Sequence, residues 1–184
     1  MAVAYRVLGV DPGSRMMGYG VIDVRGRRLD HVDSGTVSIS LRRPIEARLL
    51  SVFESITGLI ARHAPGLLAV EDVFYARNVR SAITLGQARG AVLIAASKAG
   101  LAVHTYAPAE IKMAVAGSGR AEKGQVQAMV RAILSLETLP PTDAADALAA
   151  AICHAQRAKL DARVEQASRG TAGGAARGAA RGAG

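Results

Sequence analysis

The sequence has very little cysteine and no long apolar run. Of its 184 residues only Cys153 is a cysteine, which excludes a disulfide within the chain. The longest mostly apolar stretch, residues 91–103, is interrupted by Ser97 and Lys98 and is too short for a membrane helix. No positively charged segment followed by an apolar run opens the sequence, as it would in a secretory signal. We therefore expect a cytoplasmic protein that does not contact a membrane.

Histidine and cysteine clusters at zinc-site spacing are also absent from the sequence. His154 stands alone, and we interpret it as a partly buried helix residue rather than a metal ligand. What the sequence has in excess is positive charge, with 23 Lys and Arg against 15 Asp and Glu and a net charge of +8. This excess favours a polyanionic partner, either nucleic acid or an acidic membrane surface, and the composition alone does not choose between them.

The composition changes at Asp161. The chain is long enough for one α/β domain and too short for two. Residues 161–184 are mainly Gly, Ala, Ser and Arg without apolar periodicity, so the sequence predicts a folded domain over residues 1–160 and a disordered tail over 161–184. The tail holds four arginines against two acids, which leaves most of the positive charge in the folded part.

Hydrophobic periodicity predicts a mixed sheet covered by helices. Three strand-like runs joined by short turns open the chain and indicate an antiparallel meander, at residues 6–10, 18–24 and 29–39. Helices and strands then alternate, with helices at 44–63, 81–99, 108–136 (a pair broken at 117–119) and from 142, and strands at 67–73 and 101–106. The order predicts a three-layer α/β fold, with three antiparallel strands followed by parallel strands and helices on both faces.

Two carboxylates stand at the ends of apolar strands. Asp11 follows Val7-Leu8-Gly9-Val10, which is apolar on both faces and therefore typical of a central strand. Asp11-Pro12-Gly13 taken alone would be an ordinary turn. Glu71, however, ends the apolar run 67–71 at the equivalent position, where an ionised carboxylate is costly unless a cation or a donor offsets it. The pair favours a functional site.

A third acidic position opens the last predicted helix. Thr142 is a suitable cap, and Asp143 and Asp146 are three residues apart and so share one face. The helix dipole alone would explain Asp143, whereas Asp146 lies among alanines that allow close packing on a sheet. Together with Asp11 and Glu71 these acids form a set of hard oxygen ligands suited to Mg²⁺ or Mn²⁺. Two such ions about 4 Å apart would hydrolyse a phosphodiester, so the sequence predicts a nuclease site.

Four sequence blocks occur in a fixed order over residues 6–155. They are Gly9-Val10-Asp11-Pro12-Gly13-Ser14-Arg15 with Gly18-Tyr19-Gly20-Val21; Val70-Glu71-Asp72-Val73-Phe74 with Asn78 and Leu85-Gly86-Gln87-Ala88-Arg89-Gly90; Pro108, Ile111-Lys112, Gly117-Ser118-Gly119 and Ala121-Glu122-Lys123-Gly124-Gln125-Val126; and Asp143-Ala144-Ala145-Asp146-Ala147-Leu148-Ala149. In this order and spacing the chain resembles the RuvC family of crossover-junction endodeoxyribonucleases.

The resemblance implies a ribonuclease H-like fold and a homodimer that resolves four-way Holliday junctions during DNA recombination and repair. It implies paired symmetric nicks in two strands of like polarity, two Mg²⁺ ions per active site that Mn²⁺ would replace, and a preference for T-rich cutting sites. It also implies a bacterial, nucleoid-associated location beside a branch-migration complex of the RuvA and RuvB type.

The resemblance also assigns roles to single residues. Asp11, Glu71 and Asp143 match the catalytic metal-binding acids, with Asp146 as a fourth. Further matches are Lys112 and Lys123 near the scissile phosphate, Phe74 as the aromatic side chain that enters the opened junction, and Arg80, Arg89 and Arg120 as DNA contacts. A single lysine is also commonly a solvated surface charge, and Phe74 followed by Tyr75 also fits ordinary packing.

Three other functions would fit part of the sequence. An ATPase or sugar kinase also opens with a strand, an aspartate and a glycine turn, but the chain lacks a second phosphate-binding glycine loop and is too short for two lobes. A non-catalytic DNA-binding protein would not explain buried acids, which repel phosphate when no metal is present. Only the matches of the four sequence blocks argue against a ribonuclease or an integrase of the same fold. For the dimer contacts we expect exposed apolar residues of the helix at 81–99.

Overall fold

The computed structural model describes residues 5–72 and 79–179, the side chains of 162–179 excepted. Its strands are β1 (Tyr5–Asp11), β2 (Met16–Arg25), β3 (Arg28–Ser38), β4 (Leu67–Glu71) and β5 (Ala102–Tyr106). Its helices are α1 (Ile45–His63), α2 (Val79–Lys98), α3 (Pro108–Ala116), α4 (Lys123–Ile133) and α5 (Thr142–Ala179). The chain falls into two compact units, Met1–His154 and Ala155–Gly184, and the sheet lies in the first.

The strands form one mixed sheet in the order β3-β2-β1-β4-β5. β1 pairs antiparallel with β2, and β2 with β3, whereas β4 runs parallel to both β1 and β5. This confirms the predicted meander followed by parallel strands. β1 lies at the centre, as its apolar residues on both faces predicted, and Val7 and Leu8 are both fully buried.

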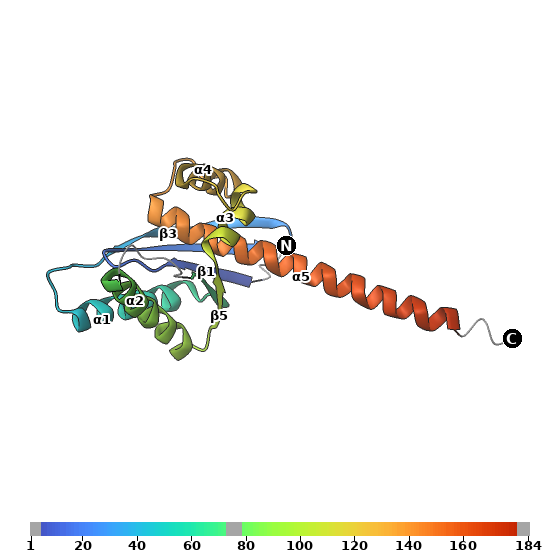
Figure 1. Ribbon diagram of the computed structural model, residues 1–184, viewed down its shortest axis with the longest axis horizontal. Coiled ribbons are helices and arrows are strands. Elements are labelled where there is room, and N and C mark those ends of the chain that lie inside the picture. The colour runs from blue at the N-terminus through green and yellow to red at the C-terminus, as the bar shows by residue number, and fades with distance from the viewer. Residues whose placement is uncertain (1–4, 73–78, 180–184) are drawn as a thin grey trace. The chain divides into compact units, whose positions relative to one another are not determined.

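One face of the sheet is covered by α1 and α2 (Figure 1). The core on this side joins Leu8 and Val10 of β1 to Ile56 of α1, Leu68 of β4 and Val92 of α2. The apolar residues of α1 recur at steps of three and four, so they form one stripe that faces the sheet. Burial of this stripe holds α1 and α2 in place as the first helical layer.

The other face is covered by α3, α4 and the first part of α5 (Figure 1). Glycines in β1 and β2 allow α5 to lie directly on the strands, because a Cβ atom on Gly9 would overlap the carbonyl oxygen of Ala147 and one on Gly18 that of Asp143. The alanines of α5 from Ala144 to Ala151 are buried. The three-layer arrangement is thereby confirmed, with the start of α5 at the carboxyl end of β1.

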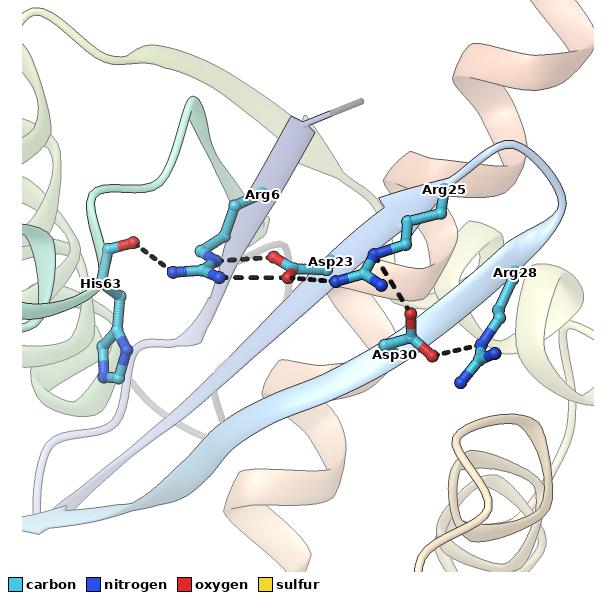
Figure 2. Close-up of polar contacts among 6 residues, drawn as sticks. All are labelled: Arg6, Asp23, Arg25, Arg28, Asp30 and His63. Carbon is cyan, nitrogen blue, oxygen red and sulfur yellow. Dashed lines mark hydrogen bonds and ion pairs between the residues drawn. The ribbon is translucent and has the colours of Figure 1, made fainter. Parts of the chain in front are cut away.

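The opposite end of the sheet is held by a chain of ion pairs (Figure 2). Arg6 Nε lies 2.6 Å from Asp23 Oδ1, and Arg6 Nη1 donates to the carbonyl of His63 at 2.8 Å, which ties the end of α1 to the sheet. Arg25 then bridges Asp23, at 3.6 Å, and Asp30, at 3.5 Å. The hydrogen bond from Arg6 lowers the pKa of the Asp23 carboxyl.

The last helix differs from the prediction. The composition predicted no regular structure after Asp161, whereas α5 continues as a helix to Ala179. Alanine has the highest helix propensity of all residues, and it is frequent in this segment, which accounts for the difference. Among the helices described, none combines the length and the apolar character needed to cross a membrane.

Candidate active site

The sheet places two acids side by side at one edge. Asp11 is the last residue of β1 and Glu71 the last of β4. The two strands are parallel neighbours, with Val10 opposite Val70, so the acids occupy the next position of the same register. The carboxyl ends of parallel strands are a common location of active sites in sheets of this kind. The two acids that the sequence placed at the ends of apolar strands therefore lie side by side.

These acids line an open cavity of about 130 Å³. Its walls are Asp11, Glu71, Pro108, Ile111, Lys112, Lys123, Val126 and Asp146. The first two come from the sheet, and the others come from α3, α4 and α5. The cavity has room for several water-sized groups. It gathers three of the predicted acids and both predicted lysines, while the apolar walls from α3 and α4 were not predicted.

Asp146 joins the cavity from the second turn of α5. Its Oδ2 atom accepts a hydrogen bond from Lys123 Nζ at 3.0 Å. Asp143, one turn earlier, is half-buried but does not line the cavity, although its charge acts on both Asp11 and Lys123. The structure therefore places Asp146 in the cavity wall and Asp143 outside the cavity lining.

The concentration of negative charge changes the acidity of the site. Burial, followed by the charge of Glu71, raises the pKa of Asp11 from 3.8 to about 7. Burial and the charge of Asp146 raise the pKa of Glu71, and the charges of Lys123 and Lys112 oppose this rise. Such shifts show that the carboxylates are held together against their mutual repulsion, which a cation would relieve.

The chemistry of these side chains fits a hard divalent cation. Carboxylate oxygens are the ligands that Mg²⁺ and Mn²⁺ prefer. Across residues 5–72 and 79–161, no group of three or more His, Cys, Asp and Glu side chains is arranged to hold an ion. Mg²⁺, however, usually keeps several waters and takes only one or two carboxylates together with substrate phosphate oxygens. Asp11 and Glu71 meet that requirement, and Asp146 would be available once Lys123 released it.

The other predicted DNA contacts occupy different positions. Lys112 lies in the cavity wall, and Arg120 is exposed in the turn between α3 and α4. Arg80 is exposed in the first turn of α2. Phe74 lies outside the described residues.

Arg89 has its guanidinium group engaged within the protein. Its Nη2 atom lies 3.4 Å from Asp72 Oδ1 and donates to Thr105 Oγ1 at 3.1 Å. Asp72 directly follows Glu71, and its backbone N–H donates to the carbonyl of Tyr106 at 2.8 Å. Arg89 thus ties α2 to the strand end that carries Glu71. Nothing in the sequence indicated this contact, because the partners are distant along the chain; a DNA contact by Arg89 stays a prediction.

His154 is a buried helix residue, as expected. It is 5% exposed, and its Nδ1 atom lies 2.8 Å from the hydroxyl oxygen of Tyr106. Its ring also packs against that of His104, with ring centroids 4.5 Å apart. Burial, followed by the charge of His104, lowers its pKa to about 4, so the ring is neutral at neutral pH.

Comparison with known proteins identifies close relatives. Residues 7–154 match the family described as crossover junction endodeoxyribonuclease RuvC. The RuvC protein of Citrifermentans bemidjiense is 49% identical over 156 residues, which cover 85% of this chain and 95% of that protein. That of Halorhodospira halophila is 53% identical over 150 residues, covering 82% and 89%.

Solved structures show the same fold. Thermus thermophilus RuvC in complex with a Holliday junction substrate superposes with a TM-score of 0.81 at 38% identity, over 85% of this chain and 96% of that one. The yeast mitochondrial Holliday junction resolvase Ydc2 superposes with a TM-score of 0.65 at 12% identity, over 91% and 86%. The second likeness, at such low identity, concerns the fold alone. The ribonuclease H-like architecture expected from the sequence is confirmed.

Proposed function

This chain belongs to the RuvC family of crossover junction endodeoxyribonucleases and is a Holliday junction resolvase, and we propose that its acidic cavity makes two symmetric nicks in strands of like polarity. The observation that carries this proposal is the cavity itself. Three carboxylates and two lysines from five separate elements of the chain line one opening at the sheet edge. A phosphodiester is the substrate whose charge suits both groups, since the lysines attract it and a cation neutralises the acids.

The family is divalent-metal-dependent, and we assign two Mg²⁺ ions to the cavity, with Mn²⁺ as a substitute. Asp11 and Glu71 would hold them, with Asp146 and Asp143 as further ligands. When bound, such ions activate a water on one side of the phosphate and stabilise the leaving oxygen on the other. Because the carboxylates stand at the ends of buried strands, their positions are fixed by the sheet.

The two lysines act on the phosphate itself. Lys112 and Lys123 line the cavity on the side of α3 and α4, opposite the acids of the sheet. There their ammonium groups bind the phosphate oxygens and stabilise the negative charge that increases in the transition state. Lys123 must exchange its bond to Asp146 for one to phosphate, so substrate binding would free Asp146. We also propose that Arg80, Arg89 and Arg120 contact the DNA.

A homodimer would supply the second nick. A Holliday junction has two-fold symmetry, and a two-fold dimer presents one cavity to each equivalent strand. The exposed face of α2 offers the apolar contact, with Val79, Ile83 and Ile94 exposed at helical spacing. Gly86 and Gly90 lie between them, and a Cβ atom on either would meet open space, which leaves this face smooth. Sedimentation of the protein with and without Ile94→Glu tests this dimer.

Three further elements of the proposal rest on sequence resemblance. Phe74, three residues after Glu71, would enter the opened junction and stabilise unstacked bases. The protein would act with a branch-migration complex of the RuvA and RuvB type. Its place would be the bacterial cytoplasm, close to the nucleoid.

The deciding experiment compares cleavage of a four-way junction, a linear duplex and an RNA–DNA hybrid. We expect paired nicks in the junction alone, none in chelator, and recovery with Mg²⁺ or Mn²⁺. Asp11→Asn and Glu71→Gln should abolish cleavage and keep junction binding, because each removes a negative charge that faces phosphate.

The matched control is Glu137→Gln, which neutralises an exposed acid outside the cavity and should cleave at the wild-type rate. Cleavage by Asp11→Asn at that rate would show that the cavity is not the active site. Equal cleavage of the linear duplex would exclude a junction-selective enzyme.

A further inference from the structure

The two ends of the β2–β3 ribbon carry arginines in different electrostatic states. At the hairpin end Arg25 and Arg28 are paired with acids of the same ribbon (Figure 2). Asp30 contacts both of them, and Asp23 contacts Arg25 as well as Arg6. Much of the positive charge of this hairpin is therefore neutralised within the protein.

The other end has three arginines without such partners. Arg15 precedes β2, while Arg42 and Arg43 lie between β3 and α1, and all three are exposed. In the part of the chain that the structure describes, none of their side chains makes a hydrogen bond or an ion pair. The backbone brings them together, because Ile39 N–H donates to Arg15 O at 2.8 Å and Arg43 N–H to Ser40 O at 3.2 Å. We call Arg15, Arg42 and Arg43 the arginine patch.

The arginine patch lies at the same edge of the sheet as the acidic cavity. Asp11, in the cavity, is paired with Gly18 of β2, and two residues before Gly18 the strand begins at Met16, opposite Ser38. The loop between Asp11 and Met16 carries Arg15. A cleaved strand held in the cavity would therefore leave it close to this patch.

The loop that carries Arg15 is fixed rather than free. Arg48 Nη2 of α1 donates to the carbonyl of Ser14 at 2.8 Å. Ser14 also lines a small cavity with Ile45 of α1 and Thr84 of α2. Thr84 follows Arg80 by one helical turn, and its hydroxyl donates to the Arg80 carbonyl at 3.0 Å. The backbone that carries Arg15 and Arg80 is thus held by packed elements, which lowers the conformational entropy lost when a ligand binds there.

We propose that the arginine patch binds the phosphate backbone of a DNA arm next to the cleaved strand and extends the DNA-binding surface past the cavity to the end of the β2–β3 ribbon. This inference rests on the proposed function and adds a binding surface to it. Each exposed guanidinium group can face a phosphate of the DNA backbone, and no internal ion pair is lost when it binds. The patch contacts phosphates and no bases, so it contributes affinity and positioning without sequence preference.

The test uses two double variants that remove the same charge from opposite ends of one ribbon. Arg42→Gln with Arg43→Gln alters the patch. Arg27→Gln with Arg28→Gln alters the hairpin, where Arg27 is an exposed residue of the turn and Arg28 the first residue of β3. The ends are about 30 Å apart along an 11-residue strand, far beyond the screening length of about 8 Å at physiological salt. Junction binding is measured in chelator over a range of salt concentrations, and cleavage at saturating enzyme is measured with Mg²⁺.

We expect the patch variant to bind the junction at least about tenfold more weakly than the wild type at low salt. The slope of log affinity against log salt concentration should fall by an amount equivalent to about one to two released counterions. The hairpin variant should bind like the wild type. Adding Arg15→Gln to the patch variant should lower the slope further, whereas cleavage at saturation should stay unchanged because the cavity is intact. Thermal unfolding of each variant ensures that folded proteins are compared.

Equal salt slopes for the two double variants would overturn the patch as a specific surface, and so would a loss of cleavage at saturation with unchanged binding. Failure of the proposed function would look different, because the wild-type protein itself would then neither prefer nor cut the junction.

Discussion

Neutralising Asp11 should stabilise the fold while it abolishes cleavage. Asp11 is held at the end of a buried strand beside Glu71, and Asp146 lies in the same cavity. Without a cation the ionised Asp11 side chain is both desolvated and repelled by these neighbours. Asp11→Asn keeps the shape and removes the charge, so the metal-free variant should unfold at a higher temperature than the wild type.

The size of the effect follows from the pKa of Asp11. It is raised from 3.8 to about 7, and each pKa unit corresponds to about 1.4 kcal/mol. The ionised carboxylate therefore destabilises the fold by up to about 4 kcal/mol at neutral pH. Because neighbouring charges relax when one is removed, we expect about half of this, which raises Tm by about 4 to 8 °C in a domain of this size.

The pH dependence has a definite sign. Folding raises the pKa of this acid, so the folded state binds the proton more tightly than the unfolded chain does. The loss of folding stability caused by ionised Asp11 is absent below the pKa of this carboxyl in the unfolded chain, near 4. It grows as the pH rises towards 7. The advantage of Asp11→Asn over the wild type should follow the same course.

The assay is thermal unfolding in chelator from about pH 4 to about pH 8, with Glu137→Gln as the control for loss of an exposed acid. Addition of Mg²⁺ should raise the Tm of the wild type more than that of Asp11→Asn, because the variant has lost a ligand. No gain in Tm near pH 8, or a gain that persists at pH 4, would refute the reasoning.

Three other changes test the site and its support. Lys123→Ala should lower cleavage by roughly 100-fold while Tm changes little, because the exposed ion pair with Asp146 contributes at most about 1 kcal/mol to stability. A large fall in Tm would instead show that the lysine has a structural role. Truncation after Lys159 should keep Tm and junction selectivity, because the composition beyond it has no apolar face, and insolubility would contradict this. Gly18→Ala should cost at least about 2 kcal/mol and most of the cleavage activity, whereas Gly58→Ala, in open space on α1, should leave both intact.

Much of the fold was predictable because local patterns and tertiary structure agree. The pattern of apolar residues predicted five strands, and every observed strand end falls within two residues of the predicted one. Asp11 and Glu71 were predictable as a pair because each ends a strand that is apolar on both faces, and parallel neighbours end at the same edge.

The remaining parts depend on contacts that no local pattern encodes. Asp143 and Asp146 share a helix face in the sequence, but only the rotation of α5 on the sheet shows which one lines the cavity. Arg89 was predicted only as a DNA contact, and no local pattern indicated that its side chain contacts Asp72 and Thr105. The helix beyond Asp161 was missed because glycine and arginine repeats suggested disorder, while alanine propensity favours a helix.

The position of α5 shows why the fold and the chemistry cannot be separated. Asp146 reaches the cavity only because the start of α5 lies directly on β1 and β2, and that contact requires hydrogen instead of a side chain at Gly9 and Gly18. A single added methyl group would meet a backbone carbonyl, which cannot turn aside as a side chain can. The helix would have to move as a unit, and both Asp143 and Asp146 would move with it. Two residues that touch no substrate therefore determine the distance between the acids of the helix and those of the sheet.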